Sequence, residues 1–183
     1  NIFSLSIGMS ACLIIYLFVN DERSFDAMHQ KNIYRLCEIQ SYPGTNTQNV
    51  ALSTPGMGPT IIEEFPEVQA YTRINPIGSQ LVDIKGKKLK VDQGAAVDST
   101  FFEIFDYPLV NGDRNTLLDG VNDAVLTESL AMIMYNDTNV IGESFILDGN
   151  TYVVRGVMED FPENSHIQYD LLISLSTIIQ NRP

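Results

Sequence analysis

The sequence predicts an α+β protein: one N-terminal transmembrane helix, followed by a mixed α+β domain. Three observations support this prediction. Residues 2–19 are apolar or small and carry no charge. All 11 Lys and Arg and all 23 Asp and Glu of the chain lie after this stretch. Beyond it, strand-like and helix-like segments follow one another without the regular βαβ repeat of a parallel sheet, which favours the α+β class.

The uncharged stretch predicts a transmembrane helix over residues 1–20. A helix of 18 residues spans roughly 27 Å, close to the hydrocarbon thickness of a bilayer. Its large apolar side chains lie on every side, whereas a buried helix of a soluble domain, the alternative, usually has one apolar stripe. Ser4, Gly8 and Cys12 recur every four residues, a spacing that lets two helices pack closely in lipid. A helix without any particular partner explains these small residues equally well.

Two kinds of export signal explain the first segment less well than a transmembrane helix does. A cleaved signal peptide has a shorter apolar core and a small-residue cleavage site, and no such site follows Val19. Residues 9–12 resemble a lipoprotein box that ends at Cys12. Cleavage there would leave the apolar residues 13–19 as the start of the mature protein, in water. We therefore expect the segment to be retained in the membrane.

The charge and the cysteines exclude several classes of function. The formal net charge of −12 opposes binding to nucleic acid and to an anionic membrane surface. The two cysteines, Cys12 in the apolar stretch and Cys37 outside it, form neither a disulfide framework nor a metal-binding pattern.

The first half of the domain contains polar linkers and a helix. Residues 21–32 are polar and helix-compatible, so we expect them to continue the first helix as a stalk. Residues 33–39 are rich in strand-forming residues and predict a strand, and residues 41–49 have the composition of a loop. A helix is expected from Thr54 to about Phe65, with a proline in its first turn and another directly after it.

The middle of the chain predicts strands and a short helix. Residues 68–74 form a plausible strand, and residues 81–91 predict a hairpin with a glycine turn. Its tip carries four lysines, which could hold an anion or simply be solvated: Lys85, Lys87, Lys88 and Lys90. Residues 98–105 predict a short helix, with Thr100 and Glu103 at capping-box spacing, and residues 109–113 predict a turn.

The last third has the clearest local signals. Residues 124–126 predict a strand, and Thr127 is expected to cap a helix over residues 128–135. A hairpin is expected from strands 144–147 and 151–158 around Asp148-Gly149-Asn150. Gly156 in its second strand indicates a bulge or a close backbone contact. Residues 169–175 predict the final strand.

No catalytic, cofactor-binding or metal site is predicted. The nucleophile elbow, phosphate-binding glycine loop and HExxH patterns are missing from the sequence. On a helical stalk, Glu22, Asp26 and His29 would share one face. These side chains could bind a metal ion, but a polar face exposed to solvent explains them more simply. Three acidic residues precede His166: Glu159, Asp160 and Glu163. They could take part in acid–base chemistry with His166, and a solvated polar loop explains them equally well.

Several segments, in order, resemble one family. The first comprises Leu5-Ser6-Ile7-Gly8, Asp21-Glu22, Ser24, Phe25-Asp26, His29 and Ile33-Tyr34-Arg35. It is similar to the start of MacB/FtsX-type ABC transporter permeases, with Met28 where Phe is usual. The segments FFEIFDYPLVNGD, AVLTESLA and VIGESFILDGNTYVVRGVMEDFPENSHIQYDLLIS resemble the extracytoplasmic core domain of the same family.

The resemblance implies a helix at 1–20, a stalk at 21–32 and a MacB-like periplasmic core domain at 33–183, cut short at its C-terminal end. It implies a non-catalytic permease subunit in the bacterial inner membrane, with the domain in the periplasm. Its partners would be a cytoplasmic ABC ATPase, a second permease copy and a periplasmic or outer-membrane protein. The work would be efflux, lipoprotein release or signalling. A membrane-anchored sensor or binding module without an ATPase is the alternative, and an anchored enzyme is a third.

Overall fold

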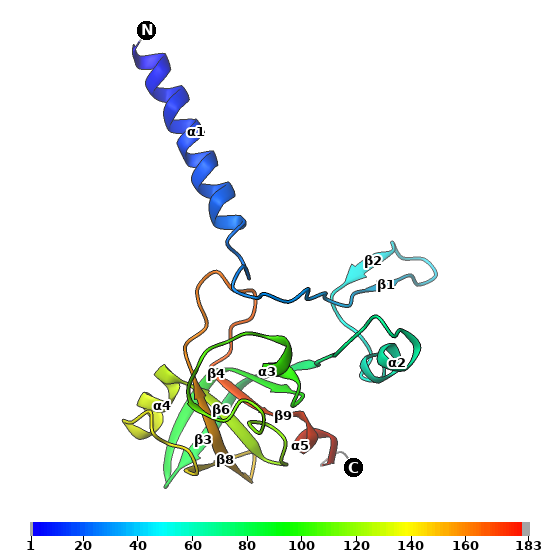
Figure 1. The fold of residues 1–183 in the computed structure, drawn as a ribbon, viewed down its shortest axis with the longest axis vertical. Coiled ribbons are helices and arrows are strands. Elements are labelled where there is room, and N and C mark those ends of the chain that lie inside the picture. Colours follow the sequence, from blue (N-terminus) through cyan, green and yellow to red (C-terminus); the bar gives the residue numbers. More distant parts are fainter. Residues whose placement is uncertain (1, 181–183) are drawn as a thin grey trace.

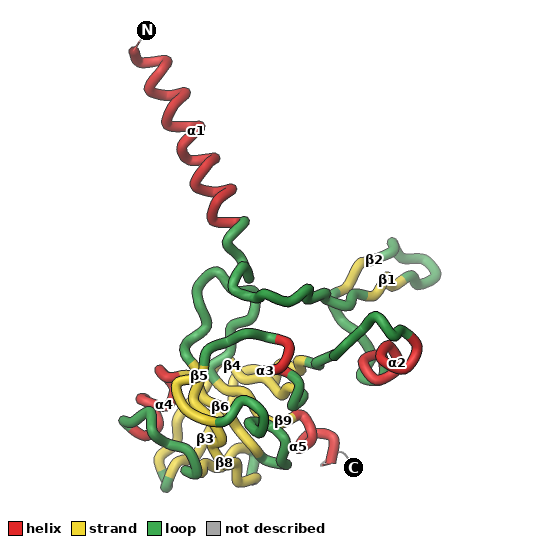
Figure 2. The backbone as a smooth tube through the Cα atoms, in the orientation of Figure 1, coloured by secondary structure: helices red, strands yellow, loops and turns green. Residues whose placement is uncertain are grey.

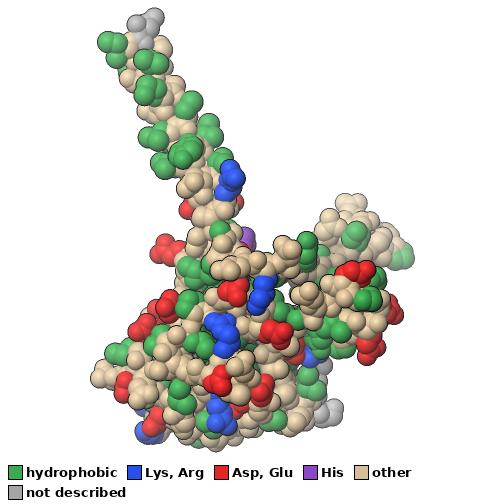
Figure 3. Space-filling model, viewed as in Figure 1, with side chains coloured by type: hydrophobic (Ala, Val, Ile, Leu, Met, Phe, Trp, Pro, Cys, Tyr) green, Lys and Arg blue, Asp and Glu red, His purple; other side chains and the backbone are tan. Residues whose placement is uncertain are grey.

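The computed structural model describes residues 2–180. The first helix, α1 (Ile2–Glu22), extends away from the rest of the molecule, and none of its residues is buried (Figure 1). Hydrophobic side chains line its visible side (Figure 3). It is the only helix among residues 2–180 that is long and apolar enough to cross a membrane. Residue 1 of the expected helix, and residues 181–183 of the expected domain, lie outside the described residues.

The prediction of a helical stalk over residues 21–32 is wrong beyond Glu22. Residues 23–28 form turns, and residues 29–37 have almost no regular structure. Tertiary hydrogen bonds are the physical reason. The N–H of Asp26 donates to the carbonyl of Asn164 at 3.0 Å, and Asp26 adopts a left-handed φ of 53°. In a continuous helix this N–H would bond within the helix instead.

The domain is built on one seven-stranded sheet, ordered β5-β8-β6-β9-β4-β3-β7. Because β7 also pairs with β8, the sheet closes on itself. The β4–β9 and β6–β8 pairs are parallel and the other pairs are antiparallel. The strands are β3 (Ile74–Ile84), β4 (Lys87–Val97), β5 (Leu109–Gly112), β6 (Asp123–Thr127), β7 (Ser144–Leu147), β8 (Asn150–Met158) and β9 (Leu171–Ser174).

Three short helices accompany this sheet, and a separate lobe lies beside it. The helices are α3 (Phe101–Ile104), α4 (Glu128–Tyr135) and α5 (Leu175–Gln180). The side lobe, residues 38–64, contains the small sheet of β1 (Glu38–Gln40) and β2 (Gln48–Val50) and the helix α2 (Met57–Glu64). Figure 2 shows it to one side of the main sheet, joined by irregular chain.

The local signals of the last third are confirmed. Thr127 precedes α4, and its Oγ1 accepts a hydrogen bond from the N–H of Leu130 at 3.3 Å. The β7–β8 hairpin turns at Asp148 and Gly149, both with positive φ. At Gly156 the β6–β8 register shifts, and an added Cβ would lie 2.4 Å from Cδ2 of Leu117. Gly156 therefore marks both the bulge and the close contact that its position indicates.

Other boundaries differ from the predictions. Residues 109–112 form strand β5 rather than a turn, because they pair with the end of β8. Within residues 33–39 only the last two join a strand, and the expected strand at 68–74 begins only at Ile74. The final strand is shorter than expected and leads directly into α5.

The core has two apolar clusters. The larger one fills the sheet under α4, with Phe145, Tyr152 and Leu171 among its members. The second, called here the aromatic cluster, comprises Ala95, Val97, Phe101, Phe102, Phe105, Tyr107, Leu117, Leu118, Val125, Met158 and Leu172. Met28 and Ile33, from the segment that follows α1, pack against the aromatic cluster. This contact joins the helix-bearing end of the chain to the domain.

Candidate functional site: the collar below the first helix

The segment that follows α1 forms a hydrogen-bonded collar on the domain. We define the collar as residues 24–31 together with the two loops that receive them, residues 103–107 and 161–167. The first contact is between Ser24 and Asn164: Nδ2 of Asn164 donates to the carbonyl of Ser24 at 3.0 Å. Together with the bond from Asp26 to the Asn164 carbonyl, it fixes the chain directly below the helix.

Asp26 is the centre of the contact with loop 161–167. Its Oδ1 accepts hydrogen bonds from Ser165 Oγ at 3.0 Å and from the His166 N–H at 3.2 Å. Its Oδ2 lies 2.7 Å from Nδ1 of His166. Partial burial raises the pKa of Asp26, but hydrogen bonds from His166 and Ser165 outweigh it, so the pKa lies below its usual value.

A buried hydroxyl pair continues this contact into the core. Ser165 is buried, and its Oγ lies 2.9 Å from the hydroxyl of Tyr107. A serine hydroxyl has one hydrogen to donate, and here Asp26 accepts it, so Tyr107 is the donor to Ser165. Burial raises the pKa of Tyr107 to about 12, which keeps the phenol protonated for this role.

His29 makes the contact with loop 103–107. Its Nδ1 accepts a hydrogen bond from the N–H of Asp106 at 3.2 Å. The ring packs against Phe105 and Tyr107, with centroid distances of 5.2 and 5.1 Å. Since Nδ1 accepts this bond, Nε2 is the ring nitrogen that can donate a hydrogen bond. This Nε2 is buried and has no hydrogen-bond partner among the described residues.

The carboxylate of Asp106 completes this side of the collar. Its Oδ2 accepts a hydrogen bond from the N–H of Gln30 at 3.1 Å, and its Oδ1 lies 3.6 Å from Nζ of Lys31. Lys31 also donates to the carbonyl of Glu103. The bond from Gln30, with the nearby charge of Lys31, lowers the pKa of Asp106.

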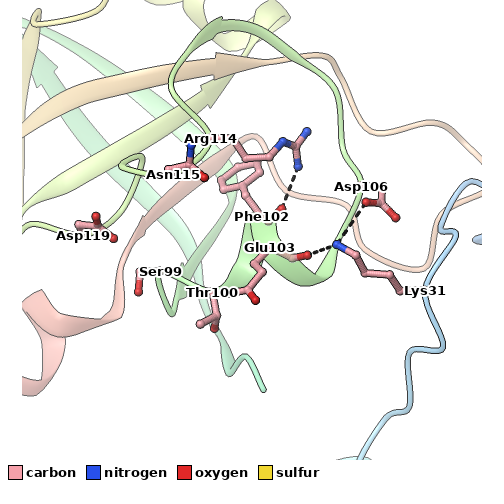
Figure 4. A pocket seen from close by; sticks show the side chains of 9 residues that line it. All are labelled: Lys31, Ser99, Thr100, Phe102, Glu103, Asp106, Arg114, Asn115 and Asp119. Atoms are coloured by element: carbon pink, nitrogen blue, oxygen red, sulfur yellow. Dashed lines mark hydrogen bonds and ion pairs between the residues drawn. The ribbon is translucent and has the colours of Figure 1, made fainter. Parts of the chain in front are cut away.

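A shallow polar depression of about 390 Å³ lies beside this contact (Figure 4). Its basic side chains are already bound. The guanidinium of Arg114 donates to the carbonyls of Phe102 at 2.8 Å, of Phe105 at 3.3 Å and of Tyr107. Lys31 forms an ion pair with Asp106 at the edge of the depression. These bonds hold the loop that receives His29, so Arg114 has a structural role in the collar.

The polar residues considered in the sequence analysis lie in a different arrangement from the one expected. Glu22, Asp26 and His29 do not share a helix face, because the helix ends at Glu22. His166 contacts Asp26, whereas Asp160 binds the start of α4 through Ser129, whose N–H donates at 3.0 Å. Both histidines of the chain thus lie in the collar, although they are far apart in sequence.

The small residues of α1 remain without a partner in the described part of the chain. Ser4, Gly8 and Cys12 lie on the exposed helix, and a Cβ added at Gly8 would meet nothing within 4 Å. Their role in helix packing stays a prediction.

Comparison with known proteins indicates the same family as the sequence segments that carry the resemblance. Residues 1–182 match the family described as MacB-like periplasmic core domain. A solved domain assigned to a permease protein of Porphyromonas gingivalis superposes with a TM-score of 0.64 at 26% identity, over 72% of this chain and 56% of that chain. No curated protein matches this sequence.

Two further solved structures share the fold. The periplasmic region of MacB from Actinobacillus actinomycetemcomitans has a TM-score of 0.53 at 17% identity, over 67% of this chain and 55% of that one. The extracellular domain of the ABC-type transporter YknZ from Gram-positive bacteria has a TM-score of 0.52 at 11% identity, over 67% and 63%. All three matches span less than two thirds of the solved chains. The family match over nearly the whole sequence shows that this chain belongs to the MacB-like periplasmic core domain family.

Proposed function

We propose that this chain is the extracytoplasmic part of an ABC transporter permease subunit, and that the collar transmits movement of α1 to the domain. In this proposal α1 spans the inner membrane and the domain lies in the periplasm. A cytoplasmic ATPase on a separate chain supplies the energy, and a second permease copy completes the membrane assembly. Efflux, lipoprotein release and signalling to a periplasmic or outer-membrane partner all fit this arrangement.

The collar is the observation that supports this function. A flexible linker after α1 would let the helix move without moving the domain. Here Asp26 is held by Ser165 and by two groups of His166, all within hydrogen-bond distance. His29 and Gln30 are held by Asp106.

Movement would therefore pass through hydrogen bonds and not through a continuous helix. The two loops of the collar, residues 103–107 and 161–167, also supply residues to the aromatic cluster or pack against it, through Phe105, Tyr107, Phe161 and Ile167. A shift or rotation of the lower end of α1 would displace both loops together. Packed cores respond to such shifts by rearranging discretely rather than by deforming gradually.

The test uses the complete permease that carries this chain, purified under mild conditions. We expect an ATPase with a Walker A motif to co-purify. In the complex, ATP binding should change the hydrogen exchange of residues 161–167 in the wild type. A double variant, Asp26→Ala with His29→Ala, should still bind the ATPase but show no such change, and Lys87→Ala on the exposed hairpin tip serves as the control.

Two results would contradict the proposal in different ways. Purification without any ATPase would favour the membrane-anchored sensor. An ATP-dependent change that survives in the double variant would leave the transporter assignment intact but exclude the collar as its mechanical link.

A further inference from the structure

The side lobe has an unusual surface. From Ile39 to Ile62 the sequence contains no charged residue, the longest such stretch in a chain that is 19% charged with a net charge of −12. No residue of β1, β2 or α2 is fully buried. Ile39, Tyr42 and Leu52 are 75%, 62% and 70% exposed. A two-stranded sheet with exposed apolar side chains is marginal in water, so this surface is suited to an interaction.

The lobe lies at the end of the domain from which α1 leaves. In Figure 1 the β1–β2 hairpin lies to one side of α1, at about the height of the base of this helix and away from the lower end of the main sheet. In Figure 3 the outer part of the lobe shows hydrophobic and neutral polar side chains, with acidic ones only near α2. The lobe is also linked to the main domain, because Nη1 of Arg73 donates to the carbonyl of Pro55 at 3.1 Å.

The collar keeps this end of the domain close to the end of the apolar stretch. After Val19 the helix continues for three residues, to Glu22, and four more residues lead to Asp26, which is bound to the domain. These seven residues span at most about 18 Å. The headgroup layer beyond the hydrocarbon is itself about 5–7 Å thick. If α1 spans the bilayer, the part of the collar around Asp26 therefore lies at or just above the headgroups.

We propose that the side lobe rests on the lipid interface of the periplasmic leaflet, through the surface that contains Ile39, Tyr42 and Leu52. Tyrosine is suited to this layer, because its ring is apolar and its hydroxyl binds water or headgroups. The neutral Gln, Asn and Thr side chains of the hairpin can donate hydrogen bonds to lipid ester and phosphate oxygens. The acidic remainder of the domain is repelled by anionic lipid, whereas the stretch from Ile39 to Ile62 carries no charge that lipid could repel.

This inference rests on the proposal that α1 crosses the membrane, and it adds a second point of contact. A domain joined to α1 can rotate about the helix axis unless a further contact holds it. A lobe placed on the lipid surface would fix that rotation and give the collar a support against which to move.

The test exploits the absence of tryptophan from the sequence. Single-tryptophan variants of the full chain are reconstituted in vesicles of phosphatidylcholine and phosphatidylglycerol that contain spin-labelled lipid. Tyr42→Trp reports on the lobe, Tyr16→Trp on α1, and Ile146→Trp is the control. Ile146 is 45% exposed on β7, opposite Asp83, near the basic hairpin tip. We expect at least a two-fold loss of fluorescence for Tyr42→Trp and Tyr16→Trp with lipid labelled near the headgroup, and no loss for Ile146→Trp.

The variants separate the two proposals. If Tyr16→Trp is quenched by lipid but Tyr42→Trp is quenched only by aqueous acrylamide, the lobe stands in water and this inference is overturned. If Tyr42→Trp is shielded from both quenchers, polypeptide covers the lobe, which also overturns it. If lipid fails to quench Tyr16→Trp, α1 is not in the bilayer, and the proposed function fails together with the inference.

Discussion

Asp26 and His166 are 140 residues apart in the sequence, yet Oδ2 of the aspartate lies 2.7 Å from Nδ1 of the histidine. The carboxylate belongs to the segment directly below α1, and the imidazole to the loop before the last strand of the sheet. This contact, extended through Ser165 to Tyr107, connects the base of the helix to the aromatic cluster. It is the contact on which we expect the joint between helix and domain to depend most.

Replacing Asp26 with Ala should destabilise the domain. The substitution removes the acceptor for Ser165 and His166, so the hydrogen of the buried Ser165 hydroxyl loses the carboxylate to which it donates. Loss of a partner to a buried polar group costs about 1–3 kcal/mol. Thermal unfolding of the solubilised chain measures the effect. Asp137→Ala is the control, because the Asp137 side chain accepts only an exposed bond from Asn139. Equal melting temperatures for the two variants would show that the collar contributes nothing to stability.

The same carboxylate should make the collar sensitive to acid. Because hydrogen bonds lower the folded pKa of Asp26 against the opposing effect of burial, its contribution to stability is complete above the unfolded pKa, about 3.9. That contribution is lost as the pH falls through the lower, folded pKa. Unfolding free energies measured from neutral pH to about pH 3 should therefore decline less steeply in Asp26→Asn than in the wild type. Parallel curves would contradict the prediction.

Local signals predicted the elements whose determining contacts are close in sequence. The hydroxyl of Thr127 caps a helix through an N–H only three residues away, and the Asp148-Gly149 turn needs nothing beyond its own backbone. The apolar stretch likewise determines α1 by its own composition. The α+β class follows from the order of such elements, and for this reason the sequence predicts it well.

The collar could not be predicted in this way. A polar, helix-compatible composition indicated a helix at 21–32, but contacts with loop 161–167 hold Asp26 in a left-handed turn. His29 similarly meets Asp106, 77 residues away. At residues 109–112, pairing with β8 overrides a turn-forming composition. In each case a distant partner decides the structure. The ordered motif around Asp26 and His29 was the one signal that marked the segment, through resemblance rather than through periodicity.

Gly156→Ala should be costly although the change is one methyl group. A Cβ at this position would lie 2.4 Å from Cδ2 of Leu117 and 3.2 Å from the carbonyl oxygen of Asn111. Overpacking of this kind costs about 1–3 kcal/mol, which thermal unfolding detects. Gly56→Ala, where an added Cβ meets nothing within 4 Å, is the matched control. In the double variant, Leu117→Ala should relieve part of the steric clash, so the two substitutions together should destabilise the domain by less than the sum of their separate effects. Strictly additive effects on the unfolding free energy would refute the steric cause.

Arg73→Lys should loosen the side lobe from the main domain. The guanidinium binds both carboxylate oxygens of Asp98, at 2.7 and 2.9 Å, and also the carbonyl of Pro55 in the lobe. Lysine retains the charge but cannot form this planar arrangement. Hydrogen exchange should increase in residues 54–64 while residues 123–127 of β6 remain protected. Lys90→Arg, a charge-conserving change at an exposed hairpin position, is the control. Unchanged exchange in the lobe would mean that other contacts position it.

Gly8→Leu should weaken association between two membrane helices far more than Leu13→Ile does. Gly8 lies between Ser4 and Cys12 at four-residue spacing, and a large side chain there would push the facing helix away. Leu13→Ile keeps the volume of an exposed apolar side chain. Oxidative cross-linking through Cys12, with Cys37→Ser in the background, measures proximity between copies in the membrane. We expect at least a five-fold lower yield for Gly8→Leu, and equal yields for both variants would rule out a close contact on this face.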